Sequence, residues 1–149
     1  MVDKILVDTN ILLYAYDLGE RVKQPKAAAV LDHLATRNAG VLTAQILAEF
    51  FVNGTRKLEK PLTVDEAYDR VQNYLLSWDV LEVTGAIVLE AARGVRIYKM
   101  HYWDAQIWAS ARLNQIPIVL TEDFDVGAVI EGVRFIDPFE EGFNPEKLG

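Results

Sequence analysis

The amino-acid sequence predicts an α/β domain with a mostly parallel sheet. Short apolar runs that suit buried strands alternate with longer segments whose apolar residues recur at helical spacing. Strands that alternate with helices favour a parallel sheet. The chain has 149 residues, which is enough for one compact core and too few to favour two. We therefore expect a single domain.

Five segments are predicted to be strands, with helices between them. The first strand covers residues 5–7 and is entirely apolar, as is typical of a strand buried on both faces. The other strands are expected at about 41–43, 80–83, 116–121 and 133–136. Helices are expected to begin near residues 11, 25, 44, 64, 86 and 101, and the third of them to reach residue 57. Thr63 and Glu66 have the spacing of a capping box before the fourth helix.

Composition and charge restrict the class of protein. The chain has no cysteine, which excludes disulfides and thiolate metal sites, and no apolar run long enough to span a membrane. Asp3 and the shortness of the first apolar run argue against a signal peptide, and the lack of cysteine favours a cytoplasmic protein. The net charge is −7, and residues 114–149, with eight acidic and two basic residues, account for −6 of it. Nucleic acid thus stays open as a substrate for the rest of the surface.

Two carboxylates follow predicted strands. Asp8 ends the apolar run 5–7, where the strand gives way to a helix, and Asp123 follows the strand that ends near residue 121. In a parallel sheet, the carboxyl ends of the strands form the edge where ligands bind. Asp8 has the alternative role of a helix N-cap, which Thr9 or Asn10 could instead fill, and Asp123 that of a loop or cap acid.

Two further carboxylates lie on helices beside apolar residues. Asp104 shares a helix face with Ile107, Trp108 and Ala111, and a carboxylate on such a face is costly unless it is compensated. It could also be a first-turn acid that the helix dipole favours. Glu49 precedes Phe50 on another helix, although one rotamer would direct it outward.

Together these four acids suggest a metal site. Like charges gathered in one place repel and raise each other's pKa, so the group would need a cation. Without cysteine or a suitably placed histidine the ligands are all oxygen, which favours Mg²⁺ or Mn²⁺. The chemistry that suits such a site is phosphodiester hydrolysis.

The same residues resemble the PIN-domain nucleases, and most closely the VapC-type toxin ribonucleases of bacterial and archaeal VapBC toxin–antitoxin pairs. The resemblance extends over nearly the whole chain. The matching motifs are Val-Asp-Thr-Asn at 7–10, Leu-Ala-Glu-Phe-Phe at 47–51 with Thr-Arg-Lys at 55–57, Tyr-Trp-Asp-Ala at 102–105, Leu-Thr-Glu-Asp-Phe at 120–124 with Gly127, and Ile-Asp-Pro-Phe at 136–139.

The resemblance implies a PIN-like nuclease domain over residues 1–139, with a twisted, mostly parallel sheet of about four to five strands sandwiched by helices. Residues 140–149 then form a polar tail, which we expect to be loosely held. The resemblance also implies cleavage of single-stranded RNA with Mg²⁺ or Mn²⁺, a homodimer, and a small antitoxin protein as partner.

The resemblance further implies the roles of individual residues. Those implied to bind metal and act in catalysis are Asp8, Glu49, Asp104 and Asp123, with Thr9, Asn10 and Thr121 as supporting polar residues. At the fourth position Asp125 is the alternative to Asp123, and Glu122 is a candidate assistant.

Basic and aromatic residues are candidates for contact with RNA. They are Arg56, Lys57 and Lys60, the series Arg93, Arg96 and Lys99 followed by His101, and the aromatic residues Tyr14, Tyr102 and Trp103. The alternatives are a solubilising surface or helix C-terminal cations for the charges, and core packing for the aromatic rings.

The sequence is also compatible with three other functions. The chain could be a housekeeping RNA-processing nuclease, or a non-catalytic PIN-like module that binds RNA or protein. Phosphatases with an aspartyl nucleophile also begin with an Asp after an apolar strand, but they have a second Asp two residues later, where this chain has Asn10.

Overall fold

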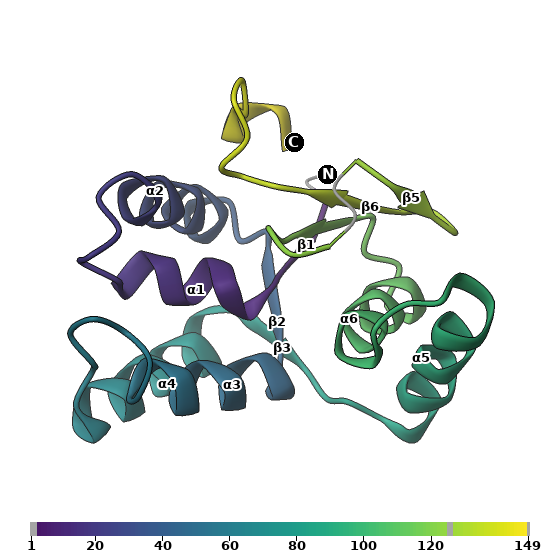
Figure 1. Ribbon diagram of the computed structural model, residues 1–149, viewed down its shortest axis with the longest axis horizontal. Coiled ribbons are helices and arrows are strands. Elements are labelled where there is room, and N and C mark those ends of the chain that lie inside the picture. The colour runs from purple at the N-terminus through teal and green to yellow at the C-terminus, as the bar shows by residue number, and fades with distance from the viewer. Residues whose placement is uncertain (1–2, 125–126, 149) are drawn as a thin grey trace.

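The computed structural model describes residues 3–124 and 127–148, which contain one six-stranded sheet with helices on both faces (Figure 1). The strands are β1 (Ile5–Val7), β2 (Gly40–Thr43), β3 (Asp79–Leu81), β4 (Ile118–Leu120), β5 (Val129–Ile130) and β6 (Val133–Ile136). The helices are α1 (Thr9–Tyr16), α2 (Lys23–Thr36), α3 (Ala44–Gly54), α4 (Val64–Ser77), α5 (Gly85–Tyr98) and α6 (Tyr102–Leu113), followed by the short 3₁₀ helix η1 (Pro145–Leu148).

The order of the strands places a switch point between β1 and β4. The sheet runs β3-β2-β1-β4-β6-β5, and its strands are parallel except for β5, which pairs antiparallel with β6. The chain moves from β1 outward to β2 and β3, and then returns to β4 on the other side of β1. In such sheets ligands bind at the carboxyl ends of the strands where the direction of winding reverses.

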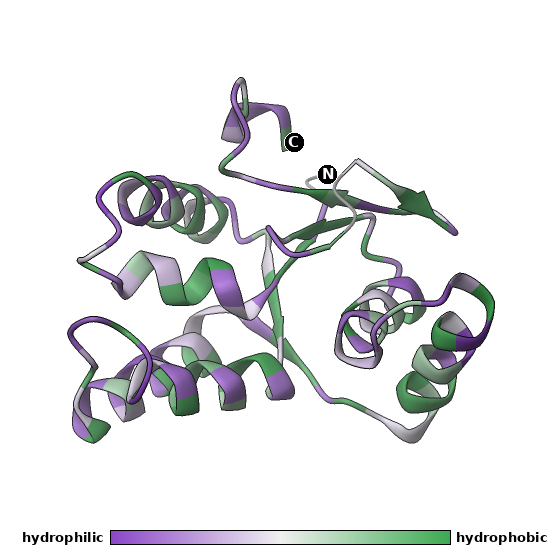
Figure 2. Ribbon diagram, in the orientation of Figure 1, coloured by the Kyte–Doolittle hydropathy of each residue, from purple (hydrophilic) through white to green (hydrophobic). Residues whose placement is uncertain are grey.

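The two directions of winding put the helices on opposite faces. Figure 1 shows α1 to α4 on one side of the sheet and α5 with α6 on the other. The core lies between these layers: β1 is fully buried, and Trp108, Phe50 and Phe135 are the largest side chains with almost no exposure. Figure 2 shows apolar residues along the central strands and more polar residues toward the outside of the helices. The predicted fold class, a mostly parallel α/β sheet between helices, is confirmed.

The elements agree with the sequence prediction except at particular boundaries. The capping box of α4 is present, since the Thr63 hydroxyl accepts from the Glu66 N–H at 3.1 Å and the Glu66 carboxylate accepts from the Thr63 N–H at 3.0 Å. Helix α3 ends at Gly54 and not at residue 57: the Arg56 N–H bonds to the Asn53 carbonyl three residues earlier, at 3.2 Å, and the returning chain at Leu62 bonds to the Gly54 carbonyl at 2.9 Å. The sixth strand, β5, was not predicted.

The expectation of a loosely held tail is wrong for residues 140–148. Leu148 is 5% exposed and belongs to the hydrophobic core, and Glu146 pairs with Arg37 of the segment after α2 at 3.5 Å. Leu148 in the core and Phe143 packed against it therefore hold a polar segment against the domain. Among the helices of the described residues, none combines the length and apolar character that a membrane crossing needs.

Candidate active site

Asp8 lies at the carboxyl end of β1 and is only 8% exposed. It is the N-cap residue of α1, so the capping role does not pass to Thr9 or Asn10 as the sequence had suggested. One carboxylate oxygen, Oδ1, accepts from the N–H of Thr9 at 2.7 Å, and Oδ2 accepts from the hydroxyl of Thr121 at 2.8 Å. The Asp8 carboxylate therefore caps α1 with one oxygen and contacts Thr121 with the other.

Thr121 connects Asp8 to Asp123. It follows β4, the neighbour of β1 at the switch point, and is 2% exposed. Its Oγ1 donates to Asp8 and accepts from the backbone N–H of Asp123 at 3.2 Å. The parallel pairing of β1 and β4, extended by the hydrogen bond from the Asp8 N–H to the Leu120 carbonyl at 2.9 Å, brings these residues together although they lie 113 positions apart.

Asn10 holds the exposed carboxylate of Asp123 from the first turn of α1. Its Nδ2 donates to Asp123 Oδ2 at 2.9 Å and approaches Thr121 Oγ1 at 3.5 Å. Its Oδ1 is buried and has no hydrogen-bond partner among the described residues. A buried acceptor without a donor is unfavourable, and a water or a cation at this position would satisfy it.

Glu49 reaches the same region from α3 and is half-buried. Its Oε2 accepts from the hydroxyl of Thr9 at 3.4 Å, and its Oε1 accepts from Gln45, one turn earlier on α3, at 3.2 Å. The outward rotamer considered from the sequence is therefore not the one observed. Glu49 thus contacts Thr9, the residue that directly follows Asp8 in the chain.

Asp104 lies in the first turn of α6 and is also half-buried. Burial raises the pKa of Asp104 above its ordinary value; His101 lowers this pKa, and the carboxylates of Asp123 and Glu49 raise it again. Asp104 is thus both a first-turn acid and a neighbour of the other acids, so the two alternatives drawn from the sequence coexist.

The pKa of Asp8 is the most perturbed in the group and rises to about 6. Burial is the main cause, hydrogen bonds from Thr121 and Thr9 act in the opposite direction, and the charges of Asp104 and Asp123 add to the rise. Mutual repulsion thus connects all four acids, because Glu49 acts on Asp104 in the same way. A cation placed among them would reverse the sign of this interaction.

The donor set suits Mg²⁺ or Mn²⁺, although the acids stand apart. Among the residues described, no three Asp, Glu or His side chains are already gathered around a point that could hold a metal ion. The oxygen-only chemistry, the mutual repulsion and the unpartnered Oδ1 of Asn10 nevertheless fit a hard divalent cation that keeps several of its waters. The oxygen ligands at this site therefore suit such a cation. The residues that would hold it are Asp8, Glu49, Asp104 and Asp123.

Glu122 and Asp125 are the two other acids near Asp123 that the sequence offers for the fourth acidic position. Glu122 points elsewhere: its Oε2 accepts from the ammonium of Lys23 at 2.6 Å, and its Oε1 accepts from the hydroxyl of Tyr14. Asp125 lies outside the described residues. The contact between Lys23 and Glu122 spans 99 positions and has no local sequence signal by which it could have been found.

The candidate RNA-binding cations are in two different situations. Arg56 and Lys57 are exposed just after α3, and Arg96 and Lys99 are exposed at the end of α5. Arg93 is instead engaged in ion pairs with Glu90 at 2.5 Å and with Glu131 at 2.7 Å, so the sequence-based suggestion that it contacts phosphates is not supported.

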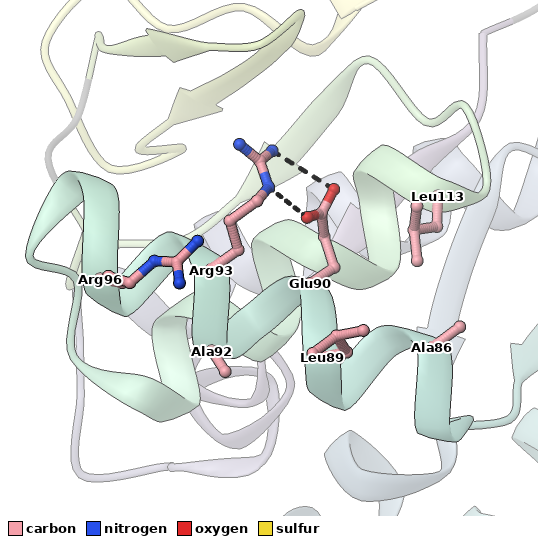
Figure 3. A pocket seen from close by; sticks show the side chains of 7 residues that line it. All are labelled: Ala86, Leu89, Glu90, Ala92, Arg93, Arg96 and Leu113. Carbon is pink, nitrogen blue, oxygen red and sulfur yellow. Dashed lines mark hydrogen bonds and ion pairs between the residues drawn. The ribbon is translucent and has the colours of Figure 1, made fainter.

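Arg93 and Arg96 line an open pocket of about 570 Å³ on the surface of α5 and α6 (Figure 3). The other residues that line it are Ala86, Leu89, Glu90, Ala92 and Leu113. None of the four acids at the switch point is among them, so this pocket is separate from the candidate active site.

Comparison with known proteins agrees with this fold. The family model of the PIN domain matches residues 5–131, and the chain therefore belongs to the PIN domain family. The resemblance inferred from the sequence motifs is confirmed at this level. No curated protein sequence matches the chain.

Solved structures with a similar fold have low sequence identity to the chain. A toxin–antitoxin complex from Klebsiella pneumoniae has a TM-score of 0.68 and 21% identity, over 92% of this chain and 99% of that one. The Mycobacterium tuberculosis toxin VapC20, which cleaves the sarcin–ricin loop, has a TM-score of 0.64 and 18% identity, over 88% and 99%. The DNA-bound VapBC of Salmonella typhimurium has a TM-score of 0.64 and 17% identity, over 93% and 99%.

Proposed function

We propose that this chain is a metal-dependent endoribonuclease that hydrolyses phosphodiester bonds of single-stranded RNA. The observation that supports this most directly is the arrangement at the switch point. Asp8, Asp123 and Glu49 share a hydrogen-bonded network through Thr121, Asn10 and Thr9, and charge repulsion connects them with Asp104. Membership of the PIN family and the VapC-type neighbours support the same chemistry.

Asp8, Glu49, Asp104 and Asp123 are proposed as the catalytic and metal-binding residues. When bound, Mg²⁺ or Mn²⁺ supplies an activated water and neutralises charge that develops on the phosphate. The hydroxyl of Thr121 fixes the orientation of Asp8, and the amide of Asn10 fixes that of Asp123. Thr9 contributes at both ends, since its N–H binds Asp8 and its hydroxyl binds Glu49.

We assign binding of the RNA substrate to exposed basic side chains and one aromatic ring. Because the chain has a net charge of −7, attraction for RNA has to be local, and Arg56, Lys57, Arg96 and Lys99 are the candidates. Trp103 is 50% exposed and directly precedes Asp104, so its ring is placed to stack on a base. Tyr14 is less suited to stacking, because the ammonium of Lys23 lies 4.9 Å from the centre of its ring and its hydroxyl donates to Glu122.

We further infer that the chain is the toxin of a toxin–antitoxin pair, with a small antitoxin protein as partner, a homodimeric state and a cytoplasmic location. The structural neighbours that are toxin–antitoxin complexes support this proposal. A short reading frame upstream that encodes a DNA-binding protein would favour the toxin. Its absence would favour a housekeeping RNA-processing nuclease.

The test of the nuclease proposal is RNA cleavage in Mn²⁺ by wild type, Asp8→Asn, Asp104→Asn and the control Asp69→Asn. Asp69 is an exposed acid on α4, remote from the network in sequence and in hydrogen bonding. We expect both site variants to lose activity on the order of 100-fold and the control to retain it. Full activity of either site variant would contradict the site, and a wild type that binds RNA without cleaving it would favour a non-catalytic module.

A further inference from the structure

The segment after β4 carries two consecutive acids that α1 holds separately. Asp123 accepts from Asn10 at 2.9 Å, and Glu122 accepts from the hydroxyl of Tyr14. Asn10 and Tyr14 are four residues apart, so they lie one turn from each other on the same face of α1. Helix α1 therefore sets the position of both acids at once.

Lys23, the first residue of α2, completes the contact around Glu122. Its ammonium lies 2.6 Å from Glu122 Oε2, 4.9 Å from the centre of the Tyr14 ring and 5.5 Å from that of Phe139. Phe139 belongs to the segment that follows β6. One small cluster, consisting of Lys23, Glu122, Tyr14 and Phe139, thus joins α1 and α2 to the segments after β4 and β6.

The partial exposure of this cluster suggests that it fixes the position of the segment carrying Asp123 more than it stabilises the fold. The side chains of Lys23 and Glu122 are 35% and 19% exposed, and partly exposed ion pairs add little to stability. Asp123 is itself exposed, and Asn10 supplies the hydrogen bond that holds its carboxylate. A side chain on an exposed segment binds a metal ion more tightly when the backbone of that segment is already fixed, because less conformational freedom is lost on binding.

We propose that Glu122 is a positioning residue. Held by Lys23 and Tyr14, it fixes the 121–123 segment so that the carboxylate of Asp123 is presented to the divalent cation. This proposal rests on the function proposed above. It assigns to Glu122 a role different from that of a metal ligand, since both of its oxygens already accept hydrogen bonds.

The experiment compares wild type with Lys23→Met, Lys23→Arg, Glu122→Gln and the control Lys26→Met. Methionine keeps most of the length of the lysine side chain beside the Tyr14 and Phe139 rings and removes the charge, whereas arginine restores the charge. Lys26 is exposed one turn further along α2 and, within residues 3–124 and 127–148, forms no ion pair with an acid. The readouts are hydrogen exchange of the Asp123 amide, Mn²⁺ affinity by calorimetry, and kcat and KM for RNA.

For Lys23→Met and Glu122→Gln we expect amide exchange at Asp123 to be about tenfold faster, and Mn²⁺ affinity and kcat to be about five- to tenfold lower. The KM for RNA should stay within twofold, and Lys23→Arg and Lys26→Met should resemble wild type. A purely structural role would lower the melting temperature without this split between kcat and KM.

Exchange and Mn²⁺ affinity within twofold of wild type in both Lys23→Met and Glu122→Gln would overturn the positioning role. If wild type itself neither binds Mn²⁺ nor cleaves RNA, the nuclease proposal fails separately. The exchange rate of the Asp123 amide, which bonds to the Thr121 hydroxyl, then decides whether Glu122 fixes the segment.

Discussion

Replacing Asp8 with Asn should stabilise the metal-free protein at neutral pH while it weakens metal binding. Asp8 is buried, and its pKa rises from 3.8 to about 6 in the folded chain. Between these two values the folded protein binds more protons than the unfolded chain does. The free energy of unfolding therefore falls as the pH rises through this window, and the stability that the protonated group contributes is lost above about pH 6.

The size of the effect follows from the rise in pKa. At roughly 1.4 kcal/mol for each pKa unit, ionised Asp8 costs about 3 kcal/mol at pH 7 relative to a neutral group. An asparagine is uncharged at every pH, but its single oxygen accepts from only one of the two donors, Thr9 and Thr121. The lost hydrogen bond lowers the stability of the variant by about 1 kcal/mol. The variant should therefore gain about 2 kcal/mol at pH 7.5 and lose slightly at pH 4.

The assay is urea denaturation of wild type and Asp8→Asn in EDTA at pH 4 and pH 7.5. The difference in unfolding free energy between the two proteins should shift by about 2–3 kcal/mol in favour of the variant between these pH values. A variant that is less stable than wild type at both pH values, with no shift between them, would refute the argument that burial and like charge strain this carboxylate.

Three further predictions concern the scaffold and the substrate. Gly94→Ala should cost about 1–2 kcal/mol in urea denaturation, because the added Cβ would lie 2.9 Å from the fully buried Trp108 ring, a clash that outweighs the gain of roughly 1 kcal/mol in helix propensity; an unchanged midpoint would show that the ring can move. Thr63→Ala should cost about 1 kcal/mol through loss of the capping box, measured in the same way, and a loss near zero would show that the cap is redundant. The double variant Arg56→Ala, Lys57→Ala should raise the KM for RNA several-fold and reduce the slope of log affinity against log salt by about 1.4, as for two lost phosphate contacts on a single strand; an unchanged slope would place the RNA elsewhere.

Sequence patterns predicted the parts of the fold that depend on local signals. The apolar run of β1, the capping box of α4 and the helical spacing of α5 each carry their own signature within a few residues. Strand β5 has two residues, too few for a pattern, and its turn through Glu131 and Gly132 relies on positive φ angles of 48° and 85°. The packing of Leu148 is not predictable either, because the two apolar residues of the polar tail, Phe143 and Leu148, are too few to show a periodicity.

For the candidate site, the sequence could nominate residues but not their contacts. Asp8 and Asp123 were assigned to the same edge because carboxyl ends of parallel strands share an edge. The bridging role of Thr121 depends on which strands are neighbours, and that information lies in the strand order and not in either motif. The same holds for Lys23 and Glu122, whose contact requires α2 to begin beside the segment after β4.

The most direct test of the proposed metal site is a calorimetric titration of Mn²⁺ into wild type, Asp8→Asn, Asp104→Asn and Asp69→Asn. We expect wild type and Asp69→Asn to bind Mn²⁺ with equal affinity, and each of the other two variants to bind it at least tenfold more weakly. Binding that is unchanged in Asp8→Asn and Asp104→Asn, or absent from wild type, would contradict the claim that these acids form one metal site.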